Sequence, residues 1–399
     1  MRAICLYLHM HQPIRYHEYS IFDVSNNSNY FDGDYNGRQS NERIFKKVTE
    51  KSYRPTLNLL EKSMQKYPGF KVSFSITGTW IEQAEKWAPE LIHQIKRMVD
   101  YGQAEILDET YYHSLAYFYD LEEFDDQVNL HTAKIKKLFG TTPKVFRNTE
   151  FAYNDALAEW ADKKGYKGIV AEGWDKILGW RSPNHVYKPA GCKNIKLLLK
   201  NYRLSDDIAF RFSNRGWSEW PLTVPKYKNW LDMDCLRGNL INLFMDFETF
   251  GEHQWADTGI FNFLEGFINT WLSEYDNHFV TVSEACDLMP PVDEISMSET
   301  ITWADTERDL SAWLSNAMQT SAMDYLYGMR KQILSTKNDE LINDWRLLTT
   351  SDHPYSMCTK YWNDGDVHAY FSAYASPYES FMYFMNVIRD IEYRINKLQ

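Results

Sequence analysis

Short apolar runs alternate with longer stretches of helical periodicity through the first three quarters of the chain, and this alternation constrains the fold most. The apolar runs contain too few polar residues for strands with one solvent-exposed face, so they indicate parallel strands buried on both faces. A strand followed by a helix, repeated seven or eight times, is typical of an α/β barrel. The strand candidates cover residues 3–9, 71–77, 103–107, 144–148, 167–172, 195–200, 239–247 and 278–282, and the helix candidates cover 55–67, 89–100, 122–139, 154–164 and 258–275.

The pattern changes at the paired prolines Pro290 and Pro291, which interrupt regular structure. Everything beyond them is predicted to be helical, with one long helix over 303–334 and a second over about 378–397. We therefore predict two domains, a catalytic barrel over residues 1–290 and a C-terminal α-helical domain over 291–399 that contributes to the active-site cleft.

Charge and cysteine usage narrow the class of protein. The formal net charge is -12, from 43 basic and 55 acidic residues, and no dense cluster of Lys and Arg is present, which argues against a nucleic-acid surface. The 5 cysteines are scattered without a CxxC spacing, so neither a disulfide framework nor a zinc knuckle is indicated. No stretch reaches the roughly 18 apolar residues of a membrane span, and the first residues do not resemble a secretory signal. We expect a soluble cytoplasmic protein.

Aromatic residues make up 16% of the chain, with 14 Trp and 27 Tyr. Core packing explains most of them, but a partly exposed indole also stacks well on the apolar face of a sugar ring. Four tryptophans near predicted loops would together form a groove for several glucose units, although each taken alone is more often a packing residue. They are Trp80, Trp174, Trp217 and Trp220.

Polar side chains follow four of the predicted strands at the point where each strand ends. In a parallel barrel the loops after the strands share one face, and active sites are built there from several strands at once. An ionised carboxylate is very costly to bury without a partner, so acids at these positions indicate chemistry. The residues are His9 and His11 after the first strand, Glu109 and His113 after the third, Glu150 after the fourth, and Asp246, Glu248, Glu252 and His253 after the seventh.

Five stretches in this order resemble the signature regions of glycoside hydrolase family 57, on its α-amylase branch. They are "HMHQP", "GQAEIL" followed by "ETYYHSL", "FRNTEFAYND", "FMDFETFGEH" and "WADTERDLSAW", which together extend from residue 9 to about 320. The resemblance implies a (β/α)7 barrel followed by a helical bundle. It also implies retaining cleavage of α-1,4-glucosidic bonds in starch-type glucans or maltooligosaccharides, without a metal or other cofactor in the chemistry.

The resemblance further implies that Glu150 is the catalytic nucleophile and Asp246 the general acid/base. Retaining cleavage needs one carboxylate that attacks the anomeric carbon and one carboxylic acid that protonates the departing oxygen, about 5–5.5 Å apart. Asp246 must hold its proton near neutrality, and we expect the apolar run before it and the charge of Glu248 to raise its pKa. Arg147 is expected to help keep Glu150 ionised, although strand alternation places Arg147 on the opposite face if the strand stays regular.

Further residues are expected to bind substrate. The resemblance implies sugar contacts for His11 and His113, and it implies that the helical domain folds back to bring Asp309 and Trp313 over the barrel mouth, with Trp303 close by. Asp305, Asp309 and Trp313 would lie on one face of a helix. The complete set of substrate-binding candidates is His11, Glu109, His113, Trp174, Glu248, His253, Trp303, Asp309 and Trp313.

Other interpretations of the same residues stay open at this point. Within the family, transfer to a sugar hydroxyl would make the chain a 4-α-glucanotransferase or a glucan branching enzyme. The pair His9 and His11 is also a weak metal signature, which would suit a metal-dependent amidohydrolase or deacetylase barrel. A non-catalytic glucan-binding protein is a third class. Glu150 has a purely structural alternative as an acid near the N-terminus of the helix at Asn154, and Asp246 has one as a salt-bridged strand end.

Overall fold

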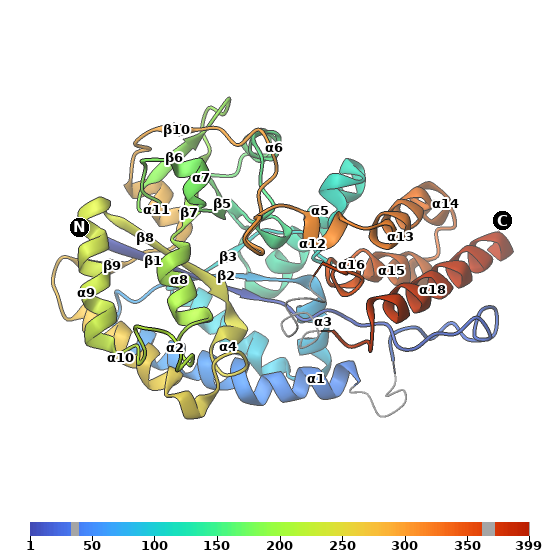
Figure 1. Ribbon diagram of the computed structural model, residues 1–399, viewed down its shortest axis with the longest axis horizontal. Helices are drawn as coiled ribbons and strands as arrows, with labels where there is room; N and C mark the ends of the chain where they lie inside the picture. Colours follow the sequence, from blue (N-terminus) through green and yellow to red (C-terminus); the bar gives the residue numbers. More distant parts are fainter. Residues whose placement is uncertain (33–39, 361–371, 399) are drawn as a thin grey trace.

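A computed structural model describes residues 1–32, 40–360 and 372–398. Figure 1 shows the strands gathered toward the end of the molecule where the chain begins, and the last helices gathered toward the opposite end of the long axis. Strands and helices alternate as expected, and the fold is α/β.

Seven parallel strands form the barrel. Pairing runs in the order β8-β1-β2-β3 in one sheet and β7-β5-β4 in the other. The two sheets meet at a parallel bridge between Asp108 and Phe146, and at a hydrogen bond from the Asn201 amide to the Asn242 carbonyl oxygen of 2.9 Å. The strands are β1 (Arg2–Met10), β2 (Val72–Ile76), β3 (Ala104–Leu107), β4 (Val145–Phe146), β5 (Gly168–Glu172), β7 (Lys196–Lys200) and β8 (Leu240–Asp246).

Side chains of β1 alternate between two apolar clusters, as a strand buried on both faces requires. Ala3, Cys5 and Tyr7 belong to the cluster inside the barrel, whereas the intervening Ile4 and Leu6 pack outward against the surrounding helices. Continuing the alternation places His9 and His11 on the inner side, beyond Tyr7. The sequence pattern therefore sets both the fold and the direction in which the polar strand ends point.

The helices around the barrel carry the capping signals expected of their sequences. Asp120 accepts a hydrogen bond from the Glu123 amide at the start of α5, and Gly140 ends the same helix in a left-handed conformation. A capping box of Thr281 and Glu284 begins α11. These helices are α1 (Asn41–Val48), α2 (Arg54–Lys66), α3 (Gly78–Trp87), α4 (Pro89–Asp100), α5 (Leu121–Phe139), α6 (Asp155–Lys164), α7 (Asp175–Leu178), α8 (Tyr202–Ala209), α9 (Val224–Asp234), α10 (Ile260–Leu272) and α11 (Val282–Leu288).

Three short strands supplement the barrel. The predicted eighth strand is β9 (Asn277–Phe279), which pairs with the start of β1. Two more were not predicted: β6 (Val186–Pro189) runs antiparallel to β7, and β10 (Glu294–Ile295) pairs with β6. Because β10 follows the paired prolines, the chain stays beside the barrel beyond the proposed boundary at residue 290, and not everything after that point is helical.

The single helix predicted over residues 303–334 is wrong. Residues before Ser311 form turns, with Asp305 and Arg308 at positive φ, and Asn316 begins a new helix through a capping box with Gln319. The second predicted helix is confirmed. The C-terminal helices are α12 (Ser311–Leu314), α13 (Ala317–Gly328), α14 (Arg330–Ser335), α15 (Asp339–Leu348), α16 (Asp352–Ser356) and α18 (Pro377–Leu398).

These helices pack at the carboxyl ends of the barrel strands, as Figure 1 shows for β1. Glu123 on α5 is fully buried and accepts hydrogen bonds from Arg330 at 3.2 Å and from Arg346 at 2.8 Å. A buried carboxylate needs such paired donors, so the contact fixes the helical region on the barrel. An antiparallel bridge between Ser114 and Thr350 joins the two regions next to the site.

Within the part of the chain that the structure describes, no helix has the length and apolar character needed to cross a membrane. The sequence leaves open whether the Asp-rich segment 32–36 of the loop 24–37 holds a structural calcium ion, and residues 33–37 lie outside the described ranges.

Candidate active site

The inward-facing residues change from apolar to polar at the carboxyl ends of the strands. His9 on β1 is in register with Asp246 on β8 and with Ser75 on β2. Glu172 on β5 is likewise in register with Lys200 on β7. Side chains from several strands thus meet in one polar layer above the apolar barrel interior.

A cavity of about 530 Å³ opens above this layer. Both predicted catalytic carboxylates, Glu150 and Asp246, line it. Its volume lies within the range of about 300–1,000 Å³ typical of small-molecule sites. The other lining residues come from the strand ends, from α8 and from three later segments: 303–313, 352–356 and 372–374.

Glu150 has donors on both carboxylate oxygens. Oε1 accepts hydrogen bonds from His113 Nε2 at 3.1 Å and from Ser351 Oγ at 3.2 Å, and Oε2 accepts one from Trp303 Nε1 at 2.8 Å. Burial alone would raise the pKa of Glu150, but the hydrogen bond and charge of His113, together with the charge of Arg147, hold it below its ordinary value. Glu150 is therefore an ionised, firmly oriented carboxylate.

The backbone at Glu150 adopts a left-handed conformation, with φ 57 and ψ 25 degrees. A non-glycine residue pays about 1–2 kcal/mol for this conformation, so the surrounding contacts must enforce it. The next residue, Phe151, has φ 52 degrees, and the Glu150 partner His113 has φ 53 degrees. Most of the strained non-glycine residues in the described ranges belong to the cavity or lie next to it, as expected of a functional site.

His113 connects Glu150 with the buried Glu109. Its Nδ1 lies 3.6 Å from Glu109 Oε2, and Arg147 Nη1 lies 3.5 Å from the same oxygen. Burial lowers the pKa of His113, but hydrogen bonds to Glu109 and Glu150 outweigh it and raise the pKa to about 9. The charged imidazole donates to Glu150 from Nε2 and faces Glu109 across an ion pair. Strand alternation had placed Arg147 on the face opposite to these groups. Because β4 ends at Phe146, the alternation does not extend to Arg147, which lies on their side.

The pKa of Asp246 is shifted in the opposite direction from that of Glu150. Burial and, next in size, the negative charge of Glu150 raise its pKa to about 6. The expectation of a raised pKa thus agrees with the structure, although the neighbouring charge comes from Glu150 and not from Glu248. One cavity contains a carboxylate held ionised and a second carboxyl group that retains its proton more readily.

The pKa of Glu248 is raised, as is that of Asp246. Burial and the charge of Asp246 raise the pKa of Glu248 to about 8, and the Tyr53 hydroxyl donates a hydrogen bond to its carboxyl group. Glu248 is therefore neutral at pH 7 and adds no negative charge beside Asp246 there.

The C-terminal region contributes Asp352 at the start of α16. His11 Nε2 donates a hydrogen bond to Asp352 Oδ2 at 2.9 Å, and His11 Nδ1 lies 3.0 Å from Thr77 Oγ1. Although burial would raise the pKa of Asp352, the charges of His11 and His113 and the His11 hydrogen bond hold it well below its ordinary value. Asp352 fixes the ring of His11, whose own pKa is lowered, mainly by burial.

The segment 302–310 is held on the barrel by an ion pair. Arg308 Nη1 lies 2.5 Å from the fully buried Glu172 Oε2, and Lys200 Nζ lies 3.7 Å from the same oxygen. Lys200 also lies 5.5 Å from the ring centre of Trp303. These contacts orient Trp303 toward Glu150.

Two groups of side chains have the composition of a metal site: His9 with Glu109 and His113, and His11 with His113 and Asp352. His113 belongs to both groups. A protonated imidazole has no lone pair for a metal, and the raised pKa of His113 together with its two carboxylate partners favours that form at neutral pH. The cluster therefore fits a hydrogen-bond network better than a metal centre.

The structure brings most of the predicted site residues together. His11, His113, Glu248, His253, Trp303 and Trp313 line the cavity with the two candidate catalytic residues. Glu109 lies fully buried behind His113.

Two predicted substrate contacts do not reach the cavity. Trp174 packs at the edge of an apolar cluster and near Lys176. Asp309 is exposed and accepts a hydrogen bond from the Ser311 amide at 2.8 Å, because the expected helix is replaced by turns. Asp305, which was not among the substrate-binding candidates, does line the cavity. Of the four tryptophans considered for a groove, Trp80 is fully buried in the core.

Several lining residues were not predicted from the sequence. Lys200 and Arg308 form the ion-pair network with Glu172, while Asp352 and Tyr355 come from α16. Strand alternation could have indicated Lys200, which ends an apolar run with its side chain inward. The residues of α16 have no such signal, because packing of the helical region on the barrel brings them to the site.

A parallel barrel with two carboxyl groups at its strand ends, whose pKa values are shifted in opposite directions, is the framework of a glycosidase. The model of glycosyl hydrolase family 57 matches residues 5–298, and the chain belongs to this family. A protein of Methanocaldococcus jannaschii, provisionally named an alpha-amylase, is 41% identical over 402 residues, which cover 98% of this chain and 84% of that protein.

Solved structures share the fold at low sequence identity. A branching enzyme of Thermococcus kodakaraensis has a TM-score of 0.69 at 13% identity, with 93% of this chain and 87% of that chain covered. An alpha-amylase of Thermotoga maritima has a TM-score of 0.65 at 14% identity, with 100% of this chain and 93% of that chain covered. A 4-alpha-glucanotransferase of Thermococcus litoralis has a TM-score of 0.64 at 16% identity, with 89% of this chain and 56% of that chain covered. The predicted (β/α)7 barrel followed by a C-terminal helical region is confirmed.

Proposed function

We propose that the chain cleaves α-1,4-glucosidic bonds of starch-type glucans or maltooligosaccharides with retention of configuration. The observation that carries the proposal is the pair of carboxyl groups in one cavity, with Glu150 held ionised and the pKa of Asp246 raised to about 6. The alpha-amylase name of the relative that is 41% identical supports the α-glucan substrate.

In the first step, a Glu150 oxygen attacks the anomeric carbon while the bond from that carbon to the departing oxygen breaks. Asp246 donates its proton to the departing oxygen, and a covalent glycosyl-enzyme forms. Asp246 is then a carboxylate, so it takes a proton from the incoming water as the water attacks the same carbon. The bond from that carbon to the Glu150 oxygen breaks, which restores the Glu150 carboxylate and releases a sugar with the original α configuration. The hydrogen bonds to Glu150 from His113, Ser351 and Trp303 hold its carboxylate in one orientation for the attack.

The walls of the cavity suit a neutral sugar. Trp303 presents aromatic surface from the C-terminal side, where Trp313 also lies but is almost fully buried. His11 and His253 present imidazoles with lowered pKa from the barrel side. A neutral imidazole both donates and accepts hydrogen bonds, as a sugar hydroxyl does. Aromatic surface beside hydrogen-bonding groups suits a sugar ring, which has C–H groups on its faces and hydroxyls at its edge.

The test is product analysis on maltoheptaose. Hydrolysis gives only shorter chains, with the α-anomer appearing first by proton NMR, whereas transfer also gives longer or branched chains. The wild type is expected to give shorter chains, and Glu150→Gln is expected to be inactive while keeping the wild-type circular dichroism spectrum. Full activity of the folded Glu150→Gln variant would refute the assignment, and predominantly longer products would replace hydrolysis by 4-α-glucanotransferase activity or, if branched, by branching activity.

A further inference from the structure

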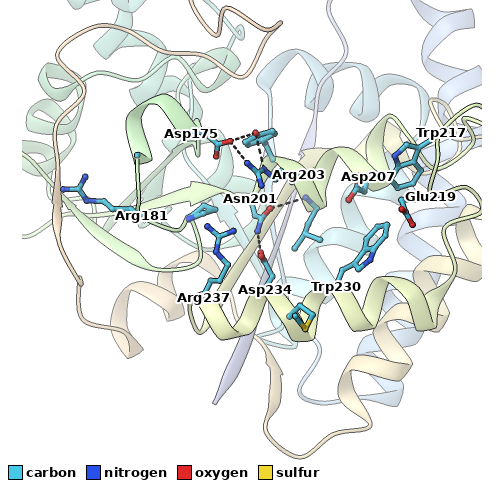
Figure 2. Close-up of a pocket in the computed structure, with 15 residues that line it drawn as sticks. Asp175, Arg181, Asn201, Arg203, Asp207, Trp217, Glu219, Trp230, Asp234 and Arg237 are labelled. Atoms are coloured by element: carbon cyan, nitrogen blue, oxygen red, sulfur yellow. Dashed lines mark hydrogen bonds and ion pairs between the residues drawn. The ribbon is translucent and has the colours of Figure 1, made fainter.

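A second cavity, of about 560 Å³, lies beside the barrel among α7, α8 and α9. Figure 2 shows two kinds of wall: Trp217, Trp230, Asp207 and Glu219 gather on one side, and Asp175, Arg181 and Arg203 on the other. The cavity has the volume of a ligand site, yet the proposed mechanism uses none of these side chains.

The charges around the second cavity nearly cancel. Its lining holds four carboxylates, from Asp175, Asp207, Glu219 and Asp234, and three guanidinium groups, from Arg181, Arg203 and Arg237. Several of these groups are already paired, since Asp175 lies 2.6 Å from Arg203, Arg181 lies 2.6 Å from Asp293, and Asp234 accepts from Asn184 at 2.7 Å. A strongly charged ligand gains little from such walls, whereas a neutral ligand with many hydroxyl groups finds both donors and acceptors.

Two half-buried indoles supply the apolar part of this wall. The rings of Trp217 and Trp230 lie with centroids 5.9 Å apart at an angle of 68 degrees. Each is packed on one side against the main core cluster, and the remaining surface lines the cavity. Rigid indoles flanked by carboxylates match a sugar ring, which has C–H groups on its faces and hydroxyls at its edge.

The second cavity and the catalytic cavity are separated by a single helix, α8. Asp206 and Ala209 of α8 line the catalytic cavity, whereas Arg203 and Asp207 line the second one. A direct contact also joins the two walls, because the Arg308 guanidinium lies 4.5 Å from the ring centre of Tyr202. A long polymer bound in the second cavity would remain next to the catalytic residues.

We propose that the cavity lined by Trp217 and Trp230 is a second binding site for an α-glucan chain, which holds long substrates beside the catalytic cavity. The choice of an α-glucan as ligand rests on the proposed function, whereas the preference for a neutral polyhydroxyl chain rests on the cavity itself. The site increases the affinity for polymers, and short oligosaccharides do not benefit because they cannot reach both cavities.

Binding to long-chain amylose is measured by affinity electrophoresis in the Glu150→Gln background. Trp217→Ala and Trp230→Ala are each expected to weaken amylose binding about three- to tenfold, the range for loss of one aromatic stacking contact. Glu219→Ala removes an exposed carboxylate of the same wall without a core contact and is expected to weaken binding about two- to fivefold. Tyr101→Ala, which removes an aromatic ring 47% exposed and outside both cavities, serves as the matched control.

Kinetics in the active background separate binding in the second cavity from a structural role. The same variants are expected to raise KM for amylose while leaving kcat/KM for maltotetraose unchanged. Unchanged amylose binding by the folded tryptophan and Glu219 variants would overturn the inference, and so would an equal loss on maltotetraose. If Glu150→Gln still cleaves glucans, the proposed mechanism is refuted but the second binding site is not. Weakened amylose binding by the tryptophan variants would still support that site.

Discussion

The two sides of the catalytic cavity are built differently. The barrel side supplies Asp246 from the last residue of β8, where strand register fixes its position, and Glu150 from the turn that follows β4. The C-terminal side supplies Trp303, Ser351 and Asp352 from turns and a short helix that no regular pattern places. The reacting groups thus lie at or just beyond strand ends, and packing of the C-terminal region brings in the groups that orient them.

Asp246→Asn tests the barrel side and is expected to have the largest effect. On maltooligosaccharides, loss of the general acid should lower kcat/KM by about 10²–10⁴-fold. On a glucoside with a nitrophenolate leaving group the loss should be small, because such a group departs without a proton. Equal losses on both substrates would contradict the acid role, and the wild type assayed on both is the reference.

Asp352→Asn tests the C-terminal side. The substitution keeps the shape but removes the charge that accepts the hydrogen bond from His11. We expect kcat/KM to fall by about 10–100-fold, since a hydrogen bond to a charged group contributes about 1.5–3 kcal/mol. Asp324→Asn, on the exposed face of α13, is the matched control. Unchanged kcat/KM in Asp352→Asn would mean that the C-terminal side does not orient His11 for the reaction.

The pH dependence of kcat/KM tests how the barrel side divides acid and nucleophile. Asp246 must be protonated, so activity should fall about tenfold per pH unit above its pKa of about 6. Glu150 must be ionised, and because its pKa is lowered, the acidic limb should lie below its ordinary value of 4.5. Glu248→Gln should leave the alkaline limb in place, because Glu248 is already neutral there. A limb displaced by one unit in this variant would show that Glu248 carries charge beside Asp246.

Trp174→Phe is expected to have the smallest effect. Trp174 does not line the catalytic cavity, so kcat/KM for maltoheptaose should stay within about twofold of wild type, as for surface changes away from a site. Trp303→Phe is the contrasting variant, because it removes the indole N–H that donates to Glu150 Oε2. Similar losses of kcat/KM in the two variants would show that tryptophans lining the cavity and tryptophans packed away from it do not differ in their effect on the reaction.

The sequence predicted the barrel side well for a physical reason. Alternation along β1 brings Ala3, Cys5, Tyr7, His9 and His11 to one face, which is the inner one, and only His9 and His11 were named from the sequence. The apolar run of β8 likewise leads to Asp246 at the edge of the cavity. Strand ends are predictable because the period of two holds until the last residue.

The C-terminal side was predicted less well because its geometry is not periodic. A continuous apolar stripe suggested one helix over 303–334, yet positive φ at Asp305 and Arg308 and a capping box at Asn316 and Gln319 divide it. The spacing of Asn316 and Gln319 was a visible signal for a new helix start. No comparable sequence signal indicates Asp352, because its position in the site depends on the docking of α16.

The order of these contributions along the chain has a consequence for biosynthesis. Both carboxylic acids leave the ribosome well before Ser351 and Asp352, the residues that secure Glu150 and His11. Because translation is directional, a nascent polypeptide carries the reactive pair before it carries the residues that orient that pair. The reactive pair is therefore fully oriented only after the segment that contains Ser351 and Asp352 has been made.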